Sequence, residues 1–352
     1  MRVTILLRSF TVGGAENMVY ELARHIAKDK AEVSILCYGK REDNALSAMA
    51  EKVCPVKYLS LTGEISLASV KTVIRALDDL NSDVVHAHMG SVAFASIWSW
   101  LRNKGFVATV HTRPDKAFNR KIELLLRLRM SRKRACLVAV SKENALLVEK
   151  YFRLPAGKYD SVNNGVDISK FYSVTHEPFT YINVARQDEN KNQRMLIKSF
   201  AKAKKECGAL RLILVGDGPL HEELKCEVKQ LGIDDSVIFT GNVSDVETYY
   251  AQSDVFVLCS YREAMPLSVL EAMAAGLPII SSRVGGMVDV VADNGLLLEE
   301  NMEEKLTAAM LQLYNERTEL GHMKKASRRI VQSYSAQEMA DQYMRIYAQV
   351  MR

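Results

Sequence analysis

The amino-acid sequence predicts an α/β protein built from two doubly wound, Rossmann-like domains that face a central cleft. At 352 residues the chain is longer than one hydrophobic core usually organises. Short β-branched runs also alternate with helix-like segments twice, once on each side of a turn-rich passage at residues 163–167. Ligands of open parallel sheets bind beyond the carboxyl ends of the strands, so we expect the functional residues in the loops there.

The first domain is expected over residues 1–172, the second over 173–334, and a closing helix over 335–352 that packs back toward the first domain. Strands of the first domain are predicted at residues 3–7, 32–37, 56–59, 84–87, 107–110 and 137–140, with helices at 15–27, 67–80, 91–101 and 142–151. Strands of the second domain are predicted at residues 179–185, 211–215, 237–240, 255–258, 279–281 and 295–298.

The composition is that of a folded, cytosolic protein. Hydrophobic residues make up 48% and charged residues 25% of the chain, which argues against disorder. The first apolar run is too short for a signal-peptide core, and no later run approaches the ~20 residues of a membrane span. The six cysteines lack C-x-x-C spacing, so we interpret them as reduced core residues.

Basic residues concentrate in residues 113–134, although the net charge of the whole chain is only +5. Leucines at 124, 125, 126 and 128 share this segment, which predicts a basic amphipathic helix on an anionic membrane surface, at the inner face of the cell membrane. The alternative is a solvated helix whose leucines pack on the core. Nucleic acid is disfavoured because no base-stacking aromatics are interleaved. The expected membrane contacts are Lys116, Arg120, Lys121, Arg127, Arg129, Arg132 and Lys133.

One stretch, residues 262–278, places two glutamates around a predicted helix start. Pro266 suits the first turn of a helix that ends near Gly276. Glu263 would then face the helix N-terminus from a loop, and Glu271 would lie within the helix. Free amides at a helix start attract phosphate, and carboxylates accept hydrogen bonds from sugar hydroxyls. A phosphate-linked sugar fits both.

The loop after the first strand carries Gly13 and Gly14 just before a helix, which allows backbone amides to approach a phosphate. A tight strand-to-helix turn is the alternative. The loop is not G-x-G-x-x-G, and no acidic residue closes the second strand, which argues against a nicotinamide or flavin site.

Three histidines lie at strand ends of the first domain. We expect His111 to contact substrate or take part in catalysis. His88 either contacts the acceptor or is structural, and His86 points back into the sheet. No ligand spacing typical of a metal site accompanies them.

In the second domain, Arg186 and Lys191 share one loop and could neutralise a diphosphate leaving group; a solvated loop is the alternative. Gly216 marks another close-approach turn, and the backbone at Val243 could contact a flat base. There is no D-x-D pair, and Asp245 is interpreted as a helix cap. We therefore expect neither an essential metal nor another cofactor.

Taken in order, Arg186, Lys191, Gly216-Asp217-Gly218 and Glu263-x7-Glu271 resemble the retaining glycosyltransferases of family 4, which have the GT-B fold. The resemblance covers essentially the whole chain and includes Gly13-Gly14 and Gly285-Gly286. Two positions depart from the family's pattern: Ala264-Met265 stand where Gly-Phe or Gly-x is frequent, and Ala185 where glycine is frequent.

The resemblance implies a role for each matching residue. Arg186 and Lys191 would hold the diphosphate near the Gly14 amide, Glu271 would accept the ribose hydroxyls, and Glu263 would contact the transferred sugar beside His111. The remaining donor contacts would come from Gly216, Val243, Ala264, Met265, Pro266 and Leu267, and the acceptor contacts from His88 and Arg113.

The expected activity is that of a hexosyltransferase. A sugar would move from a nucleotide sugar, which we expect to be UDP-linked, to a lipid-linked glycan or other cell-surface polysaccharide acceptor, by front-face attack in which the leaving phosphate takes the proton. Two alternatives are a UDP-sugar epimerase of the same fold and a non-catalytic scaffold that binds a sugar nucleotide or a membrane.

Overall fold

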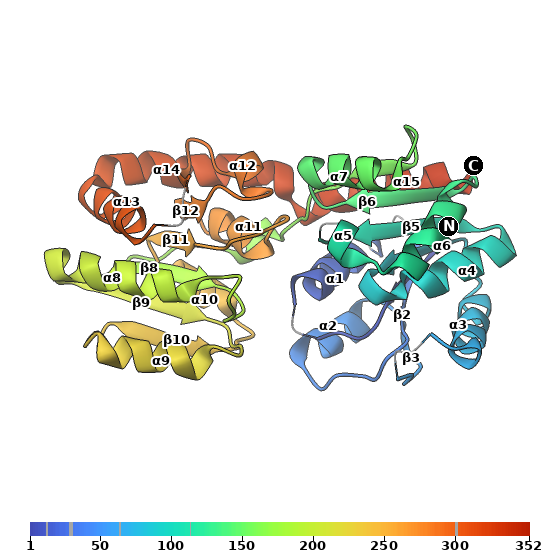
Figure 1. Ribbon diagram of the computed structural model, residues 1–352, viewed down its shortest axis with the longest axis horizontal. Coiled ribbons are helices and arrows are strands. Elements are labelled where there is room, and N and C mark those ends of the chain that lie inside the picture. The colour runs from blue at the N-terminus through green and yellow to red at the C-terminus, as the bar shows by residue number, and fades with distance from the viewer. Residues whose placement is uncertain (12, 28–30, 63–64, 113, 300–301) are drawn as a thin grey trace. The chain divides into compact units, whose positions relative to one another are not determined.

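The computed structural model describes residues 1–11, 13–27, 31–62, 65–112, 114–299 and 302–352. It contains two compact units: unit 1 is Met1–Gly165 with Ala336–Arg352, and unit 2 is Val166–Ser335. The division predicted at residue 172 therefore falls inside unit 2, and the last helix belongs to unit 1. Each unit has one parallel sheet with helices against it (Figure 1).

The described part of unit 1 contains a seven-stranded parallel sheet in the order β3-β2-β1-β4-β5-β6-β7. Six of these strands match predicted runs; five of the six are largely buried, and strands buried on both faces read as continuous apolar segments. The strands are β1 (Arg2–Leu7), β2 (Glu32–Cys37), β3 (Val56–Tyr58), β4 (Val84–His88), β5 (Gly105–Val110), β6 (Ala135–Ala139) and β7 (Tyr159–Ser161).

Helices cover both faces of this sheet. They are α1 (Gly14–Ile26), α2 (Ala45–Val53), α3 (Leu67–Asp79), the short 3-10 helix η1 (Met89–Ser91), α4 (Val92–Arg102), α5 (Pro114–Ala117), α6 (Arg120–Met130), α7 (Lys142–Phe152) and α15 (Ala336–Met351).

Helix α15, the last of the chain, completes unit 1. Its buried residues Met339, Tyr343, Tyr347 and Val350 recur at helical spacing and form one face. This face packs against α1 and against β4, β5 and β6, and Figure 1 shows the red helix running beside β5 and β6. The C-terminal helix thus packs against central strands of the sheet to which the N-terminal strand β1 belongs.

The described part of unit 2 contains a six-stranded parallel sheet in the order β10-β9-β8-β11-β12-β13. The strand order reverses between β8 and β11, and ligands of such sheets bind at this switch point. The strands are β8 (Phe179–Val184), β9 (Leu210–Val215), β10 (Val237–Gly241), β11 (Val255–Leu258), β12 (Ile279–Ser282) and β13 (Gly295–Leu298).

The helices of unit 2 flank this sheet and enclose one apolar core, in which Tyr181, Phe200 and Leu306 have no exposed surface. They are η2 (Ile168–Lys170), α8 (Gln193–Cys207), α9 (His221–Gln230), α10 (Val246–Ala251), α11 (Leu267–Ala274), α12 (Met287–Val290), α13 (Glu303–Asn315), α14 (Arg317–Ile330) and η3 (Val331–Tyr334). Throughout the described ranges of the chain, no helix is both long and apolar enough to cross a membrane.

Candidate active site

The loop after β8 presents Arg186 at the carboxyl edge of the second sheet. The Arg186 side chain is 72% exposed, and its Nε lies 3.8 Å from the Asp188 carboxylate. The next residue, Gln187, is buried; it donates to the Gly216 carbonyl (2.8 Å) and accepts from His221 Nδ1 (2.7 Å). The backbone of the loop is therefore fixed, while the guanidinium remains accessible to an anion.

Lys191, on the same loop, pairs with Glu263 from the loop after β11. Lys191 Nζ lies 2.6 Å from Glu263 Oε1, and the side chains are 19% and 9% exposed. Backbone contacts hold the two loops together: the Tyr261 amide donates to the Asn190 carbonyl (2.8 Å), and Asn190 Nδ2 donates to the Arg262 carbonyl (2.9 Å). Two of the predicted catalytic residues, 72 positions apart in the chain, are thus in direct contact.

Helix α11 begins beside this pair. Pro266 occupies its N-cap position without a side-chain hydrogen bond, so it leaves first-turn amides for solvent or a ligand. At the other end, Gly276 adopts φ +83°, and the amides of Gly276 and Leu277 donate to the carbonyls of Met273 and Ala272. This Schellman motif stops the helix where the sequence predicts.

Glu271 is half-buried in α11 and receives support from α10. The Tyr250 hydroxyl lies 3.1 Å from Glu271 Oε2 and 2.9 Å from the Ser268 carbonyl. Burial, with the neighbouring Glu271 charge, raises the pKa of Tyr250 well above its usual value, so this hydroxyl remains a donor. Tyr250 therefore orients a carboxylate that was predicted to accept ribose hydroxyls; the sequence reasoning missed this residue.

Glycines allow the loops of this edge to lie backbone against backbone. A Cβ atom on Gly285 would lie 1.8 Å from the Glu263 carbonyl oxygen, and one on Gly216 would lie 2.3 Å from the Ala185 carbonyl oxygen. The Gly286 amide donates to the Ala264 carbonyl at 2.8 Å. The loops after β8 and β9 therefore support each other, and the loop after β12 supports the one that carries Glu263.

The other predicted donor contacts lie in these same loops. Val243 is half-buried in the loop between β10 and α10. Ala264, Pro266 and Leu267 are half-buried, whereas the Met265 side chain is buried, so Met265 offers mainly its backbone.

In unit 1, α1 starts at Gly14, with Gly13 as its N-cap in an extended conformation. The buried carboxylate of Glu16 accepts a hydrogen bond from Thr11 Oγ1 (2.7 Å) and lies 2.6 Å from the place of a Cβ atom on Gly13. An acidic group in the first turn stabilises the helix N-terminus. Gly13 is thus explained by local packing, and phosphate contact at the exposed Gly14 stays a prediction.

The three histidines of unit 1 form a layered cluster. His86 is fully buried; its Nδ1 lies 2.7 Å from the Tyr347 hydroxyl and its Nε2 lies 2.7 Å from Thr109 Oγ1. His88 packs against it, with 4.2 Å between ring centroids and 43° between the ring planes, and is also fully buried. His88 Nδ1 lies 2.9 Å from Nε2 of the half-buried His111. Direct acceptor contact by His88 is therefore wrong for this arrangement, because the ring has no exposed surface and contacts His111 instead.

Burial sets the charge of this cluster. It lowers the pKa of His86 to about 3 and that of His111 to about 4, and it lowers the pKa of His88 well below 6.5. All three rings are therefore neutral at pH 7.

Some residues of the basic segment make contacts within unit 1, whereas others are exposed to solvent. Arg129 is 2% exposed and donates to Ser99 Oγ and to the carbonyls of Lys104, Lys133 and Arg134, at 2.8–3.1 Å. Burial lowers its pKa to about 10, so it stays charged at pH 7. Arg129 therefore holds the loop after α6, and its predicted membrane contact is wrong.

Arg127 also makes contacts within unit 1. It pairs with Glu123 (2.9 Å) and donates to the carbonyls of Tyr151 and Phe152 at 2.6 and 3.2 Å, where α7 ends. Its side chain is 35% exposed, so a membrane contact by Arg127 stays a prediction. The residues of the set that are exposed are Arg120, Lys121, Arg132 and Lys133. Arg113 and the side chain of Lys116 lie outside the described residues.

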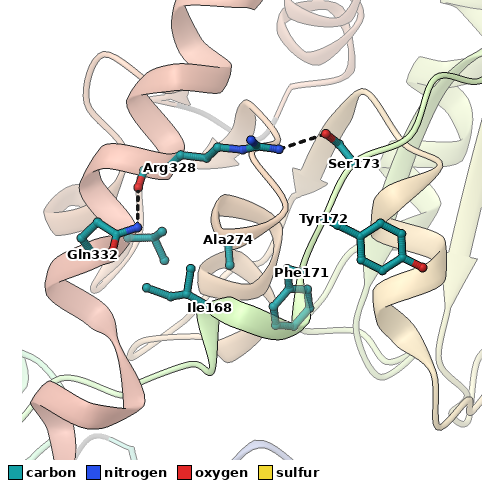
Figure 2. Close-up of a pocket in the computed structure, with 8 residues that line it drawn as sticks. Ile168, Phe171, Tyr172, Ser173, Ala274, Arg328 and Gln332 are labelled. Atoms are coloured by element: carbon teal, nitrogen blue, oxygen red, sulfur yellow. Dashed lines mark hydrogen bonds between the residues drawn. The ribbon is translucent and has the colours of Figure 1, made fainter.

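A hollow of about 410 Å³ lies beside Ala274, the last residue of α11 (Figure 2). Phe171, Tyr172 and Ala274 line it together with Arg328, whose Nη2 donates to Ser173 Oγ at 2.9 Å. Arg328 also fills the space beside Gly276, where a Cβ atom would lie 2.5 Å from its Nε. This region anchors the end of the helix that carries Glu271.

Within the described residues, no group of three His, Cys, Asp or Glu side chains is placed to hold a metal ion. The expectation that no metal is needed stays a prediction.

Two family models match the chain in succession. The model for "Glycosyltransferase Family 4" matches residues 12–170, and the model for "Glycosyl transferases group 1" matches residues 167–330. Among curated relatives, N-acetyl-alpha-D-glucosaminyl L-malate synthase of Bacillus anthracis is 31% identical over 53% of this chain and 49% of its own length. The chain spans about half of this relative's length, and 55% and 60% of the lengths of two further curated relatives.

A second relative extends over the whole chain. The GalNAc-alpha-(1->4)-GalNAc-alpha-(1->3)-diNAcBac-PP-undecaprenol alpha-1,4-N-acetyl-D-galactosaminyltransferase of Campylobacter jejuni is 23% identical over 99% of both chains. Among solved structures, Anabaena HepE in complex with UDP and glucose superposes with a TM-score of 0.85, at 19% identity over 99% of both chains. At this identity the likeness establishes the fold.

Two parallel sheets with flanking helices, and a glutamate pair around a helix start, define the class of GT-B glycosyltransferases. The chain belongs to glycosyltransferase family 4, since the two family models together span residues 12–330.

Proposed function

We propose that this protein transfers a hexose from a UDP-linked donor to a lipid-linked glycan acceptor, with retained configuration at the transferred carbon. The observation that carries the proposal is the convergence of Arg186, the Lys191–Glu263 pair and the start of α11 at one edge of the second sheet. The UDP and glucose complex of Anabaena HepE and the undecaprenol-linked substrate in the Campylobacter enzyme's name support the donor and acceptor classes.

Each group at this edge has a task that its geometry suits. Arg186 and Lys191 neutralise the diphosphate as the bond between sugar and phosphate breaks, while the amides of the first turn of α11 donate to its oxygens. Glu271, oriented by Tyr250, accepts the ribose hydroxyls. Glu263, held by Lys191, accepts hydroxyls of the transferred sugar.

The reaction that we propose is a front-face displacement. The acceptor oxygen bonds to the anomeric carbon on the face from which the diphosphate departs, and the acceptor proton moves to the departing phosphate oxygen. A double displacement would instead need a carboxylate nucleophile on the opposite face. Because two protein cations supply the positive charge, we expect the activity to persist in the presence of a chelator.

We further propose that unit 1 binds the inner face of the cell membrane through a surface formed by α6 and the end of α4. Lys121, Leu124 and Leu128 are exposed and recur at three- and four-residue spacing on one face of α6. Arg132 continues this face and stacks on the exposed Trp100 of α4, with 5.7 Å from its Cζ to the ring centroid. Apolar side chains that insert beside lysine and arginine suit an anionic bilayer.

Co-sedimentation with vesicles that contain phosphatidylserine tests this surface. We expect the Lys121→Gln/Arg132→Gln double variant and the Leu124→Ser/Leu128→Ser double variant each to reduce the bound fraction. Lys205→Gln/Lys229→Gln removes the same charge from exposed positions of unit 2 and is the matched control. Unchanged vesicle binding in both test variants would mean that α6 is a solvated helix and not a membrane-binding one.

A thermal-shift screen of nucleotide sugars tests the donor site. A ligand at 100 times its Kd stabilises the folded state by about 2.7 kcal/mol. We expect UDP and at least one UDP-sugar to raise the melting temperature, Glu271→Gln to reduce the shift with both, and Glu263→Gln to reduce only the extra shift due to the sugar. If no UDP compound shifts the wild-type protein, the donor assignment is wrong.

A further inference from the structure

The contact between His88 and His111 fixes which nitrogen of His111 carries a proton. His88 Nδ1 and His111 Nε2 face each other at 2.9 Å. Because burial lowers the pKa of both rings, each is neutral at pH 7 and carries one proton. One proton therefore lies between the two facing nitrogens, and it belongs either to His88 or to His111.

The surroundings of the other ring nitrogen of His88, Nε2, distinguish the two possibilities. His88 Nε2 is buried and has no hydrogen-bond partner among the described residues. If His111 Nε2 held the shared proton, His88 would carry its own proton on Nε2, as a buried N–H without an acceptor. If His88 Nδ1 holds it, Nε2 is only a lone pair. Stranded buried N–H groups are rare in folded proteins, and acceptors that lack a donor are less so. The second arrangement is favoured.

We infer that His88 donates from Nδ1 to His111 Nε2, so that His111 presents an N–H group at Nδ1. His111 then acts as a hydrogen-bond donor to a hydroxyl oxygen of the bound sugar, and it cannot serve as a general base there. His88 is a positioning residue that acts through His111. The contact with a sugar rests on the proposed transferase function, whereas the proton position does not.

The surroundings hold both rings in this arrangement. His111 directly follows β5, and the buried Asn144 of α7 donates to the carbonyls on either side of it, those of Val110 (3.3 Å) and Thr112 (3.1 Å). His111 Nδ1 has no hydrogen bond to any residue that the structure describes. The backbone is thus fixed by Asn144 and the ring by His88, which leaves Nδ1 for a ligand.

His88 is held in place by its contact with His86. Its ring packs against His86, which is fixed by Thr109 and by Tyr347 of α15. The Tyr343 hydroxyl bonds Thr109 Oγ1 at 2.8 Å. The last helix of the chain therefore supports the histidine cluster that sets the proton on His111.

Nitrogen NMR of the protein labelled with ¹⁵N-histidine tests the inference directly, since the chain has only seven histidines. Two-bond proton–nitrogen correlations distinguish the two neutral tautomers, and the His88→Asn and His111→Gln variants assign the signals. We expect both His88 and His111 in the Nδ1–H form, unchanged between pH 8 and pH 6. An Nε2–H tautomer on His111 would overturn the proposal, whatever the enzyme's activity.

Kinetics with an identified donor separate positioning from a structural role. An asparagine side chain can place an N–H group near the position of His88 Nδ1, whereas leucine cannot. We expect His88→Leu to lower kcat by about tenfold or more with an unchanged melting temperature, and His88→Asn to restore most of it. If His88→Asn were as impaired as His88→Leu while its fold and stability were intact, the donated proton would have no role in positioning.

Discussion

The Lys191–Glu263 pair allows a stability prediction that needs no substrate. Two unit charges 2.6 Å apart attract by about 1.6 kcal/mol in bulk water and by about 6 kcal/mol at an effective dielectric constant of about 20. The cost of removing the charges from water offsets much of this attraction. Because the side chains are 19% and 9% exposed, we expect a net coupling energy of about 1–3 kcal/mol.

A double-mutant cycle measures this coupling. Urea unfolding would compare the wild-type protein with Lys191→Met, Glu263→Gln and the double variant, without ligand. We expect the double variant to lose less stability than the two single variants lose together, because each single variant leaves a partly buried group without its partner. For a unit of about 170 residues, 1 kcal/mol corresponds to about 2–4 °C in melting temperature.

An exposed pair in the same unit is the control. Arg194 and Glu223 lie 2.9 Å apart, but their side chains are 42% and 61% exposed. Their coupling in the matched Arg194→Met/Glu223→Gln cycle should stay below about 1 kcal/mol, since solvent screens the charges. If the effects of Lys191→Met and Glu263→Gln add to within about 0.5 kcal/mol, the pair does not stabilise the site and the reasoning is refuted.

Three further predictions concern the units separately. Arg129→Met should destabilise the protein by about 3–5 kcal/mol in urea unfolding, because it removes four hydrogen bonds donated by a buried guanidinium, whereas Arg132→Gln should change stability by less than about 0.5 kcal/mol; equal effects would contradict the division of the basic segment. Burial lowers the pKa of His111 from 6.5 to about 4, so as the pH falls the unfolded chain binds a proton on this ring before the folded protein does. The stability that neutral His111 allows above pH 6.5 is therefore lost as the pH falls toward 4. His111→Gln should make the urea midpoint fall less steeply over that interval, with His86 and His88 accounting for the remaining fall, and the exposed His322→Gln should leave the slope unchanged. Gly285→Ala should abolish UDP binding in calorimetry, since its Cβ would meet the Glu263 carbonyl at 1.8 Å, whereas Gly208→Ala, also at positive φ but with open space around it, should bind UDP normally.

Much of the fold follows from the sequence because the central strands of both sheets are buried on two faces and therefore appear as apolar runs. Strand β7 was missed, since Tyr159–Ser161 is short, polar and at a sheet edge. The strand orders also could not be derived, because they depend on contacts between segments far apart in the chain.

The candidate site was predicted as residue types at loop positions, but its pairings were not. The contact of Lys191 with Glu263 and the support of Glu271 by Tyr250 join different loops and helices, for which the sequence carries no local signal. Arg129 is a different case: it follows Ile122 and Leu126 at helical spacing on the stripe that faces the core, and this signal could have excluded it from the membrane set.

Transfer of labelled sugar to a lipid acceptor is the direct test of the proposed transferase activity. The protein would be incubated with radiolabelled UDP-sugars and a membrane lipid extract, and label in the lipid phase would be counted for the wild-type protein, Glu263→Gln and Lys191→Met. We expect label to enter the lipid phase with at least one donor, and we expect each variant to reduce this transfer at least a hundredfold. Undiminished transfer by both variants, or label that stays with the nucleotide for every donor, would contradict it.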